Sequence, residues 1–139
     1  MKNAGEVING ITCSSGIDIG LQGAYAIQET CRVKIAFADT GVDSDHKDLE
    51  LNIDTALARD FSSGDSTDWE DESGHGTSTA GILGALHNDM GVAGVCGLPE
   101  ADLEVLVPLK VWPDGVAVDQ DVICSYLINA MAYSSDHYP

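Results

Sequence analysis

The sequence predicts an α/β fold with a doubly wound parallel sheet and helices on both faces, of which this chain holds an incomplete part. Two segments, 32–38 and 101–111, are nearly continuous runs of apolar and β-branched residues, as in strands covered on both faces. Segments 75–86 and 120–134 have apolar residues at helical spacing. Alternating strands and helices joined by right-handed crossovers form a parallel sheet. The chain stops after the second helix, where the next core strand is expected.

The remaining segments predict smaller elements. Residues 1–16 are polar, lack a hydrophobic period and are expected to form a loose arm. Residues 17–27 have the apolar spacing of a short helix, interrupted by two glycines. Leu49, Leu51 and Ile53 alternate with polar residues as a brief strand does. Residues 54–73 are too acidic for regular structure and predict a surface connection.

The helix expected after residue 74 has one large and one small side. Its larger residues, Thr79, Ile82, Leu83 and Leu86, recur at helical spacing, whereas glycine and alanine occupy the other side. Small residues let neighbouring backbones approach, so the pattern predicts a buried central helix. The helix over 120–134 is expected to be capped near Asp119.

Length and charge limit the classes of function. The chain has 139 residues, enough for one domain with its own core. Six Lys and Arg oppose 23 Asp and Glu, and the resulting net charge of −17 disfavours nucleic acid and anionic membrane surfaces as partners. No segment approaches the roughly 20 apolar residues of a membrane span, and residues 1–16 lack the apolar core of a signal peptide.

The four cysteines, Cys13, Cys31, Cys96 and Cys124, lack the Cys-x-x-Cys spacing of a zinc site. Four cysteines allow three disulfide pairings, among which sequence alone does not decide. The pairing of Cys13 with Cys31 across the first helix is the one to test. Cys124 lies in an apolar helical stretch and is expected to be a small buried residue.

Two residues stand where an α/β sheet builds its sites. Asp39 ends the first strand and is followed by a glycine turn, and His75 begins the small-residue helix. A carboxylate that orients an imidazole is two thirds of a nucleophilic triad. The helix dipole disfavours the imidazolium of His75, the carboxylate favours it, and together they predict a titration near neutral pH.

These two motifs resemble the subtilisin-like serine proteases, or subtilases. Asp39-Thr40-Gly41-Val42-Asp43 matches the aspartate motif of that family, and His75-Gly76-Thr77 with Ala80-Gly81 matches its histidine motif, 36 residues after Asp39. The resemblance covers about residues 33–109 and implies that residues 17–139 are the amino-terminal part of a subtilisin-like catalytic domain. It also implies a secreted or extracellular protein.

The resemblance leaves one motif unmatched. The family's nucleophile motif, Gly-Thr-Ser-Met-Ala-x-Pro, and its oxyanion asparagine are expected later and have no counterpart before Pro139. Residues 76–80 imitate the nucleophile motif, but they are fused to His75 and lack the following proline. Ser78 is therefore a poor nucleophile, and we expect the isolated chain to be inactive.

Further sites are implied by the resemblance. Subtilases pair their substrate with an extended segment after the second core strand, which corresponds here to Gly115, Val116, Ala117 and Val118. They often hold a structural Ca²⁺ through an acid and the loop after the histidine helix. The corresponding oxygens here belong to the side chains of Asp48 and Asn88 and to the main chain of Leu86, Met90 and Val92. Such an all-oxygen set suits a hard cation.

The resulting prediction is a serine endopeptidase of the subtilisin type, with polypeptide substrates and a missing carboxy-terminal half as partner. One alternative is a non-catalytic subtilase-like module that binds calcium or a partner. Another is an aspartic protease, since residues 37–41 contain Asp-Thr-Gly and residues 82–84 read Ile-Leu-Gly. That alternative requires an all-β fold and leaves the motif around His75 unexplained.

Overall fold

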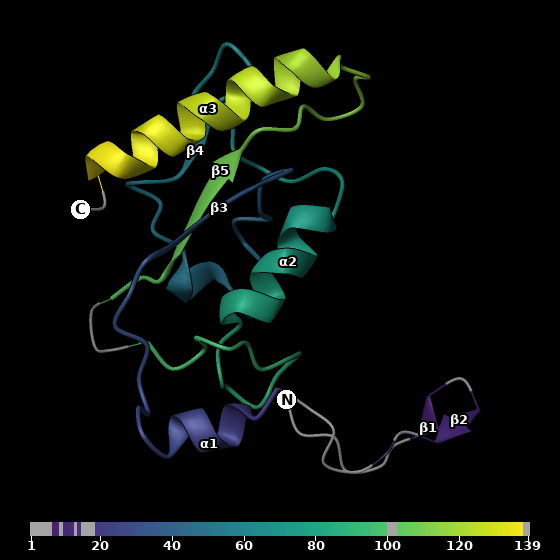
Figure 1. Ribbon diagram of the computed structural model, residues 1–139, viewed down its shortest axis with the longest axis vertical. Coiled ribbons are helices and arrows are strands. Elements are labelled where there is room, and N and C mark those ends of the chain that lie inside the picture. The colour runs from purple at the N-terminus through teal and green to yellow at the C-terminus, as the bar shows by residue number, and fades with distance from the viewer. Residues whose placement is uncertain (1–6, 9, 13, 15–18, 100–102, 138–139) are drawn as a thin grey trace.

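The fold is centred on a small parallel sheet. The computed structural model describes residues 7–8, 10–12, 14, 19–99 and 103–137 (Figure 1). Three strands are ordered β3-β5-β4, with both neighbours of the central strand parallel to it. Their bounds are β3 (Ile35–Asp39), β4 (Arg59–Asp60) and β5 (Leu106–Lys110). The predicted parallel α/β sheet is confirmed.

The central strand β5 is buried along its whole length, as its continuous apolar run predicts. Strand β3 is different, because it lies at the edge of the sheet. Its register with β5 runs from Ile35 opposite Leu106 to Asp39 opposite Lys110, and Ala36 and Ala38 are exposed. The prediction that β3 is covered on both faces is therefore wrong for the chain as it stands.

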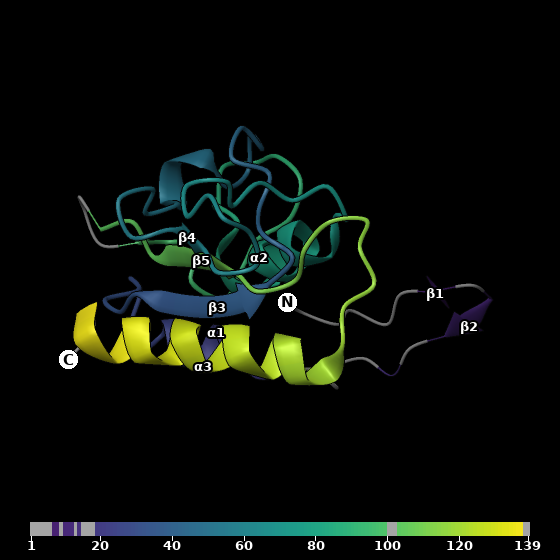
Figure 2. The same ribbon diagram turned by 90° about the horizontal axis from the view of Figure 1, so that it is seen from above.

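Two long helices cover opposite faces of the sheet, α2 (His75–Gly84) and α3 (Gln120–His137) (Figure 2). Successive residues of β5 point to opposite faces. Accordingly Leu106 packs in one apolar cluster with Ala80 of α2, and Val107 packs in another with Ala130 of α3. The chain thus has the predicted helices on both faces.

Helix α2 begins at the predicted residue, but it is only partly buried, whereas a buried central helix was predicted. Its buried residues are Gly76, Ala80 and Gly84, and Ile82 is 56% exposed. A Cβ atom at Gly84 would lie 3.0 Å from the side chain of Leu106. The helix therefore turns its small residues to the sheet, which lets the two backbones approach closely.

Several smaller elements also depart from the sequence pattern. The expected strand near residue 51 is a short 3-10 helix, η1 (Glu50–Asn52), in which Leu51 is exposed. Strand β4 lies within the acidic connection that was predicted to be irregular. Helix α1 (Leu21–Tyr25) is shorter than the predicted 17–27 helix.

The amino-terminal arm also departs from the prediction of a loose segment, because β1 (Val7–Ile8) and β2 (Ile11–Thr12) form an antiparallel pair within it. At the other end, Asp119 caps α3 as predicted, because its carboxylate accepts a hydrogen bond from the amide of Asp121 at 2.9 Å. None of the helices in the described part of the chain is long and apolar enough to span a membrane.

The disulfide joins Cys31 to Cys96, with 5.2 Å between their Cα atoms, so the predicted pairing of Cys31 with Cys13 is wrong. The segment before β3 runs beside the loop after α2, where the amide of Cys31 donates to the carbonyl of Leu98 at 2.7 Å. This contact is distant in sequence and invisible in cysteine spacing. Cys13 itself lies outside the described residues. Cys124 is free and exposed on α3, which contradicts the expected burial.

We predict that the disulfide is a major source of stability, because it closes a loop of 65 residues that contains both Asp39 and His75. A Cys31→Ser/Cys96→Ser variant should lose about 4 kcal/mol of unfolding free energy on the chain-entropy model. Denaturant unfolding measures this loss. Cys124→Ser is the matched control and should change stability by less than about 0.5 kcal/mol. Equal stability of the double variant and the parent would contradict the prediction.

Candidate active site

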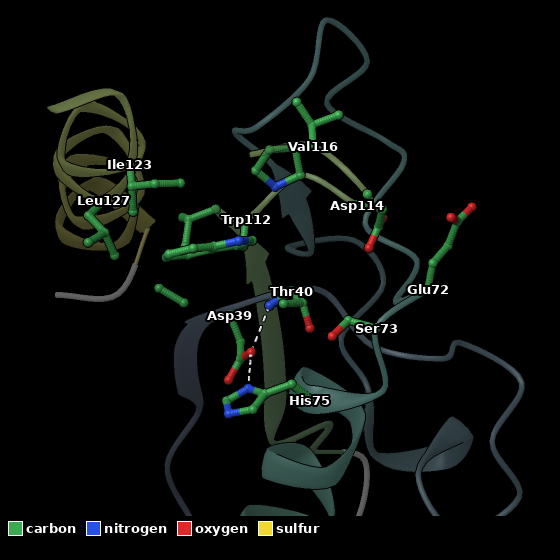
Figure 3. Close-up of a pocket in the computed structure, with 14 residues that line it drawn as sticks. Asp39, Thr40, Glu72, Ser73, His75, Trp112, Asp114, Val116, Ile123 and Leu127 are labelled. Carbon is green, nitrogen blue, oxygen red and sulfur yellow. Dashed lines mark hydrogen bonds and ion pairs between the residues drawn. The ribbon is translucent and has the colours of Figure 1, made fainter. Parts of the chain in front are cut away.

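The site begins with Asp39, the last residue of β3, at the edge of the sheet where parallel strands present their carboxyl ends. One carboxylate oxygen of Asp39 accepts the amide N–H of Thr40 at 2.8 Å. The same oxygen lies 2.7 Å from Nδ1 of His75 (Figure 3). Because an ionised carboxylate only accepts, Nδ1 carries the proton and Nε2 is left as the basic nitrogen. This geometry is that of an acid that orients a base.

His75 is the first residue of α2, and its side chain is 73% exposed, whereas that of Asp39 is 12% exposed. The hydrogen bond that His75 donates to Asp39, and next the negative charge of Asp39, raise the pKa of His75 above its ordinary value, with a smaller contribution from the charge of Asp71. Desolvation acts in the opposite direction but does not prevail. The imidazole is therefore accessible to a substrate and more basic than a free histidine.

A second carboxylate, Asp71, holds the start of α2 and was missed by the sequence analysis. One of its oxygens accepts from Thr40 Oγ1 at 2.8 Å and from the amides of Ser73 and Gly74 at 3.0 Å. The other accepts from the amide and hydroxyl of Thr77 at 2.8 and 2.6 Å. Amides at the start of a helix lack acceptors within the helix, so the Asp71 carboxylate accepts their hydrogen bonds. The signal in the sequence is an acid four residues before a histidine that opens a helix.

The pKa of Asp71 reflects these bonds. Burial by itself would raise it, but the hydrogen bonds from Thr77, Thr40 and Gly74 together lower it. Asp71 thus stays ionised while it anchors the helix, and its charge adds to the basicity of His75.

Two glycines allow the strand and the helix to meet. Gly41 has φ of 105°, and a Cβ atom there would lie 2.5 Å from the carbonyl oxygen of Trp69. A Cβ atom at Gly76 would overlap the carbonyl oxygen of Gly41. Thr40 completes the contact, since its Oγ1 accepts the amide of Gly76 at 2.9 Å. Both glycines are therefore needed to bring Asp39 within reach of His75.

The pair opens into a pocket of about 850 Å³. One wall carries Ser73 and His75, the opposite wall is the turn after β5, and α3 closes the third side (Figure 3). The lining residues are Ala38, Asp39, Thr40, Glu72, Ser73, His75, Val111, Trp112, Pro113, Asp114, Gly115, Val116, Ile123 and Leu127. A mainly apolar cavity beside an oriented base is suited to an organic substrate.

The predicted substrate segment lies partly in this wall. Gly115 and Val116 line the pocket, and Gly115 has φ of 64°, a conformation that favours glycine. Residues 116–118 have no regular secondary structure. Whether residues 115–118 pair with a substrate as an edge strand remains a prediction.

The structure also brings Asp48 to the loop after α2. Asp48 is 3% exposed, and its Oδ2 accepts the amide of Val92 at 2.9 Å. Its main-chain carbonyl accepts the amide of Leu86, also at 2.9 Å. Its Oδ1 is buried and has no hydrogen-bond partner among the described residues. Asn88 and Met90 belong to the same loop, where Asn88 Oδ1 accepts the amide of Met90 at 3.1 Å.

A buried carboxylate oxygen without a partner costs free energy unless a cation or a donor satisfies it. The residues therefore fit a hard cation in this respect. The part of the chain that the structure describes contains no cluster of three or more His, Cys, Asp or Glu side chains suited to a metal. Calcium at Asp48 would thus depend on main-chain and amide oxygens.

A parallel α/β sheet with an acid-oriented histidine at its carboxyl edge is the arrangement in which several hydrolase folds hold two of three triad residues. Residues 31–119 match the Subtilase family, and the chain belongs to this family. The helices also exclude the aspartic protease alternative, since residues 82–84 lie within α2.

Individual relatives agree with this assignment. An intracellular serine protease of Paenibacillus polymyxa is 44% identical over 81 residues, which are 56% of this chain and 24% of that protein. Subtilisin E of Bacillus subtilis (strain 168) is 39% identical over 71 residues, or 51% of this chain and 17% of that protein.

A solved structure shows the same fold. The epidermin leader peptide processing serine protease EpiP of Staphylococcus aureus aligns with a TM-score of 0.59 at 23% identity, covering 76% of this chain and 24% of that one. The chain thus spans about a quarter or less of each of these proteins.

We predict that Asp39→Asn lowers the pKa of His75 towards its ordinary value, because the variant removes the charge that raises it. A histidine whose pKa is raised in the folded state stabilises the protein at pH values below its unfolded pKa of about 6.5. This stabilisation is lost as the pH rises through the folded pKa. The stability lost in the variant should therefore shrink as pH rises through that window. NMR titration of the His75 ring measures the pKa directly, with Ser78→Ala as the neutral control. An unchanged His75 pKa in Asp39→Asn would contradict the assigned contact.

Proposed function

We propose that this chain supplies the acid and the base of a serine endopeptidase of the subtilisin type. The observation that carries the proposal is the 2.7 Å contact between Asp39 and Nδ1 of His75 at the mouth of the pocket. In the reaction, Nε2 of His75 takes the proton of a serine hydroxyl as the serine attacks a peptide carbonyl. Asp39 holds the tautomer and stabilises the imidazolium that forms.

The nucleophile comes from outside these 139 residues. Ser78 lies on the same helix as His75, and its hydroxyl donates to the carbonyl of Gly74 at 2.7 Å. In the described residues this hydroxyl is thus bound to its own helix backbone and not to Nε2 of His75. Family membership together with the small fraction of each relative that is covered supports a separate carboxy-terminal half as the source of the serine.

The edge of the sheet offers a place for that half. Strand β3 pairs with β5 on one side, and it is the outermost strand of the described sheet. Ala36 and Ala38 of β3 are exposed, and so is Val33 just before it, although their residue types suit a covered strand. Addition of a parallel strand here would cover these residues and place new loops beside Asp39.

The substrate is a polypeptide, with its backbone along residues 115–118 and its side chains over the apolar lining of the pocket. Gly115 and Val116 already line that cavity. The net charge of −17 opposes nucleic acid and anionic membranes as partners. A location outside the cell is supported by the Cys31–Cys96 disulfide, since disulfides persist in oxidising compartments. The relative named as intracellular shows that family membership does not decide this point.

A structural Ca²⁺ is the second part of the proposal. Asp48 would contribute its free Oδ1, Asn88 its amide oxygen, and Leu86, Met90 and Val92 their carbonyls. The support is the buried, unpartnered Oδ1 of Asp48 beside this loop. When bound, the ion would satisfy this carboxylate and tie the 86–92 loop to the segment before η1. Calcium binding without catalysis is also what the non-catalytic alternative requires, so the two parts need separate tests.

The proposed division of the triad predicts that the chain alone does not react with a fluorophosphonate, because it lacks an activated serine. Addition of the rest of the protein should give labelling of one serine outside residues 1–139, and His75→Ala should abolish it. Mass spectrometry of the labelled peptides identifies the serine. Stoichiometric labelling of Ser78 in the isolated chain would overturn the proposal, and so would labelling that survives His75→Ala.

For calcium, we predict that the ion raises the stability of the folded protein by about 2.7 kcal/mol at a hundredfold excess over its dissociation constant. Thermal unfolding in calcium and then in chelator measures this. Asp48→Asn removes the charge at nearly constant shape and should abolish the shift. Asp89→Asn makes the same change on an exposed residue of the same loop with φ of 65°, which Asn tolerates, and should retain it. A full shift in Asp48→Asn would place the ion elsewhere.

A further inference from the structure

A buried lysine lies beneath the pocket and takes no part in the proposed chemistry. Lys110 is the last residue of the central strand β5 and is only 4% exposed. In the sheet register it stands between Asp39 of β3 and Asp60 of β4. A buried ammonium group is costly unless it is paired and hydrogen-bonded, so its partners indicate its purpose.

The Lys110 ammonium has two partners, which come from different loops. It donates to the main-chain carbonyl of Glu70 at 2.6 Å, and it forms an ion pair with the carboxylate of Asp114. The side chain of Asp114 is 16% exposed, and its second oxygen is buried without a partner among the described residues. Lys110 is therefore the countercharge on which Asp114 depends.

One partner, Asp114, lines the pocket, and the other, Glu70, lies in the loop that leads to the opposite wall. Glu70 directly precedes Asp71, the carboxylate that holds the first turn of α2 and thereby His75. Asp114 lines the other wall and directly precedes Gly115. Glu70 and Asp114 are 44 positions apart in sequence, because Lys110 lies 40 positions after Glu70 and four before Asp114. One side chain thus joins the loop that carries the base to the turn that is expected to bind the peptide.

We propose that Lys110 is a positioning residue that fixes the distance between the two walls of the pocket. With its ammonium bound to Glu70 and Asp114, neither loop moves without the other. This fixed spacing keeps a peptide on residues 115–118 in line with Nε2 of His75. The meaning for catalysis rests on the proposed function, whereas the mechanical coupling of the two loops does not.

A lysine is suited to this place because it has three donors on a long, flexible stem. It reaches a carbonyl on one side and a carboxylate on the other from a backbone that the sheet already fixes. Methionine at this position would keep most of the volume and lose every donor. Asp114 would then be a buried carboxylate without a countercharge, which is strongly destabilising on its own.

The test therefore pairs two variants of the present chain. Lys110→Met alone should lower the unfolding temperature, and adding Asp114→Asn should restore most of it by removing the stranded charge. Amide hydrogen exchange is then measured in the restored double variant. If Lys110 holds the walls, exchange should be at least about tenfold faster than in the parent at both 70–74 and 112–116.

A matched control lies just outside the strands of the same sheet. Lys34 and Asp54 form a second partly buried ion pair away from the pocket, with side chains 27% and 5% exposed. Lys34→Met/Asp54→Asn should leave exchange at both walls unchanged. Asp114→Asn alone keeps the bond from Lys110 to Glu70, so it should accelerate exchange at 112–116 and not at 70–74. This single variant decides the matter if the double variant does not fold.

Parent-like exchange at both walls in the double variant would overturn the proposal, as would equal acceleration by the Lys34 control. In the completed enzyme, the double variant should lower kcat for long peptides at least about tenfold, because a bound peptide that is out of line with Nε2 of His75 reacts more slowly. An unchanged kcat would also overturn it. The two proposals can fail separately. A completed protein that cleaves no peptide would count against the proposed function, whereas faster exchange at both walls in its double variant would still support the coupling of the two loops.

Discussion

The arrangement of the site depends on one carboxylate that never touches the base. Asp71 receives five hydrogen bonds, from the hydroxyls of Thr40 and Thr77 and from the amides of Ser73, Gly74 and Thr77. These hydrogen bonds join the end of β3 to the start of α2. They thereby fix the backbone on either side of the 2.7 Å contact between Asp39 and His75. An exposed imidazole has few contacts of its own, so its direction is set by the backbone beneath it.

The segment that contains Asp71 is also connected to the opposite side of the pocket. Glu70, one residue before Asp71, accepts a hydrogen bond from the buried Lys110. The helix that carries the base, the loop before it and the turn beyond β5 therefore share a single polar network under a mainly apolar cavity. Such a network is stabilising when each member is satisfied and costly when one is removed. The unpartnered oxygen of Asp114 is the place in the described chain where it is incomplete.

Local patterns predicted the site better than its surroundings. The end of β3 and the start of α2 were predicted because an apolar run and a helical period stop at Asp39 and begin at His75. The glycine and alanine residues of α2 were predicted to let a neighbouring backbone approach, but the segment that approaches them was not predicted. Their partner Gly41 lies 35 residues before Gly76, and only the folded chain shows how closely they approach.

Long-range contacts escaped the sequence for a related reason. The Cys31–Cys96 disulfide and the contact of Lys110 with Glu70 join residues 65 and 40 positions apart, and no spacing rule connects them. Strand β4 has only two residues, too few for a period, and forms because β5 offers a free edge. Asp71 was one acid among several in an acidic connection, and its importance is visible only in its partners.

The ability of His75 to act as a base through Nε2 depends on which of its nitrogens carries the proton. Nitrogen-15 NMR of the histidine rings in the neutral form of this chain reads that tautomer directly. The structure predicts protonated Nδ1 and bare Nε2 at His75, and the variant Asp39→Ala should lose this preference. A His75 ring protonated at Nε2 in the parent chain would contradict the central claim, because Asp39 could then not be the acceptor that prepares the base.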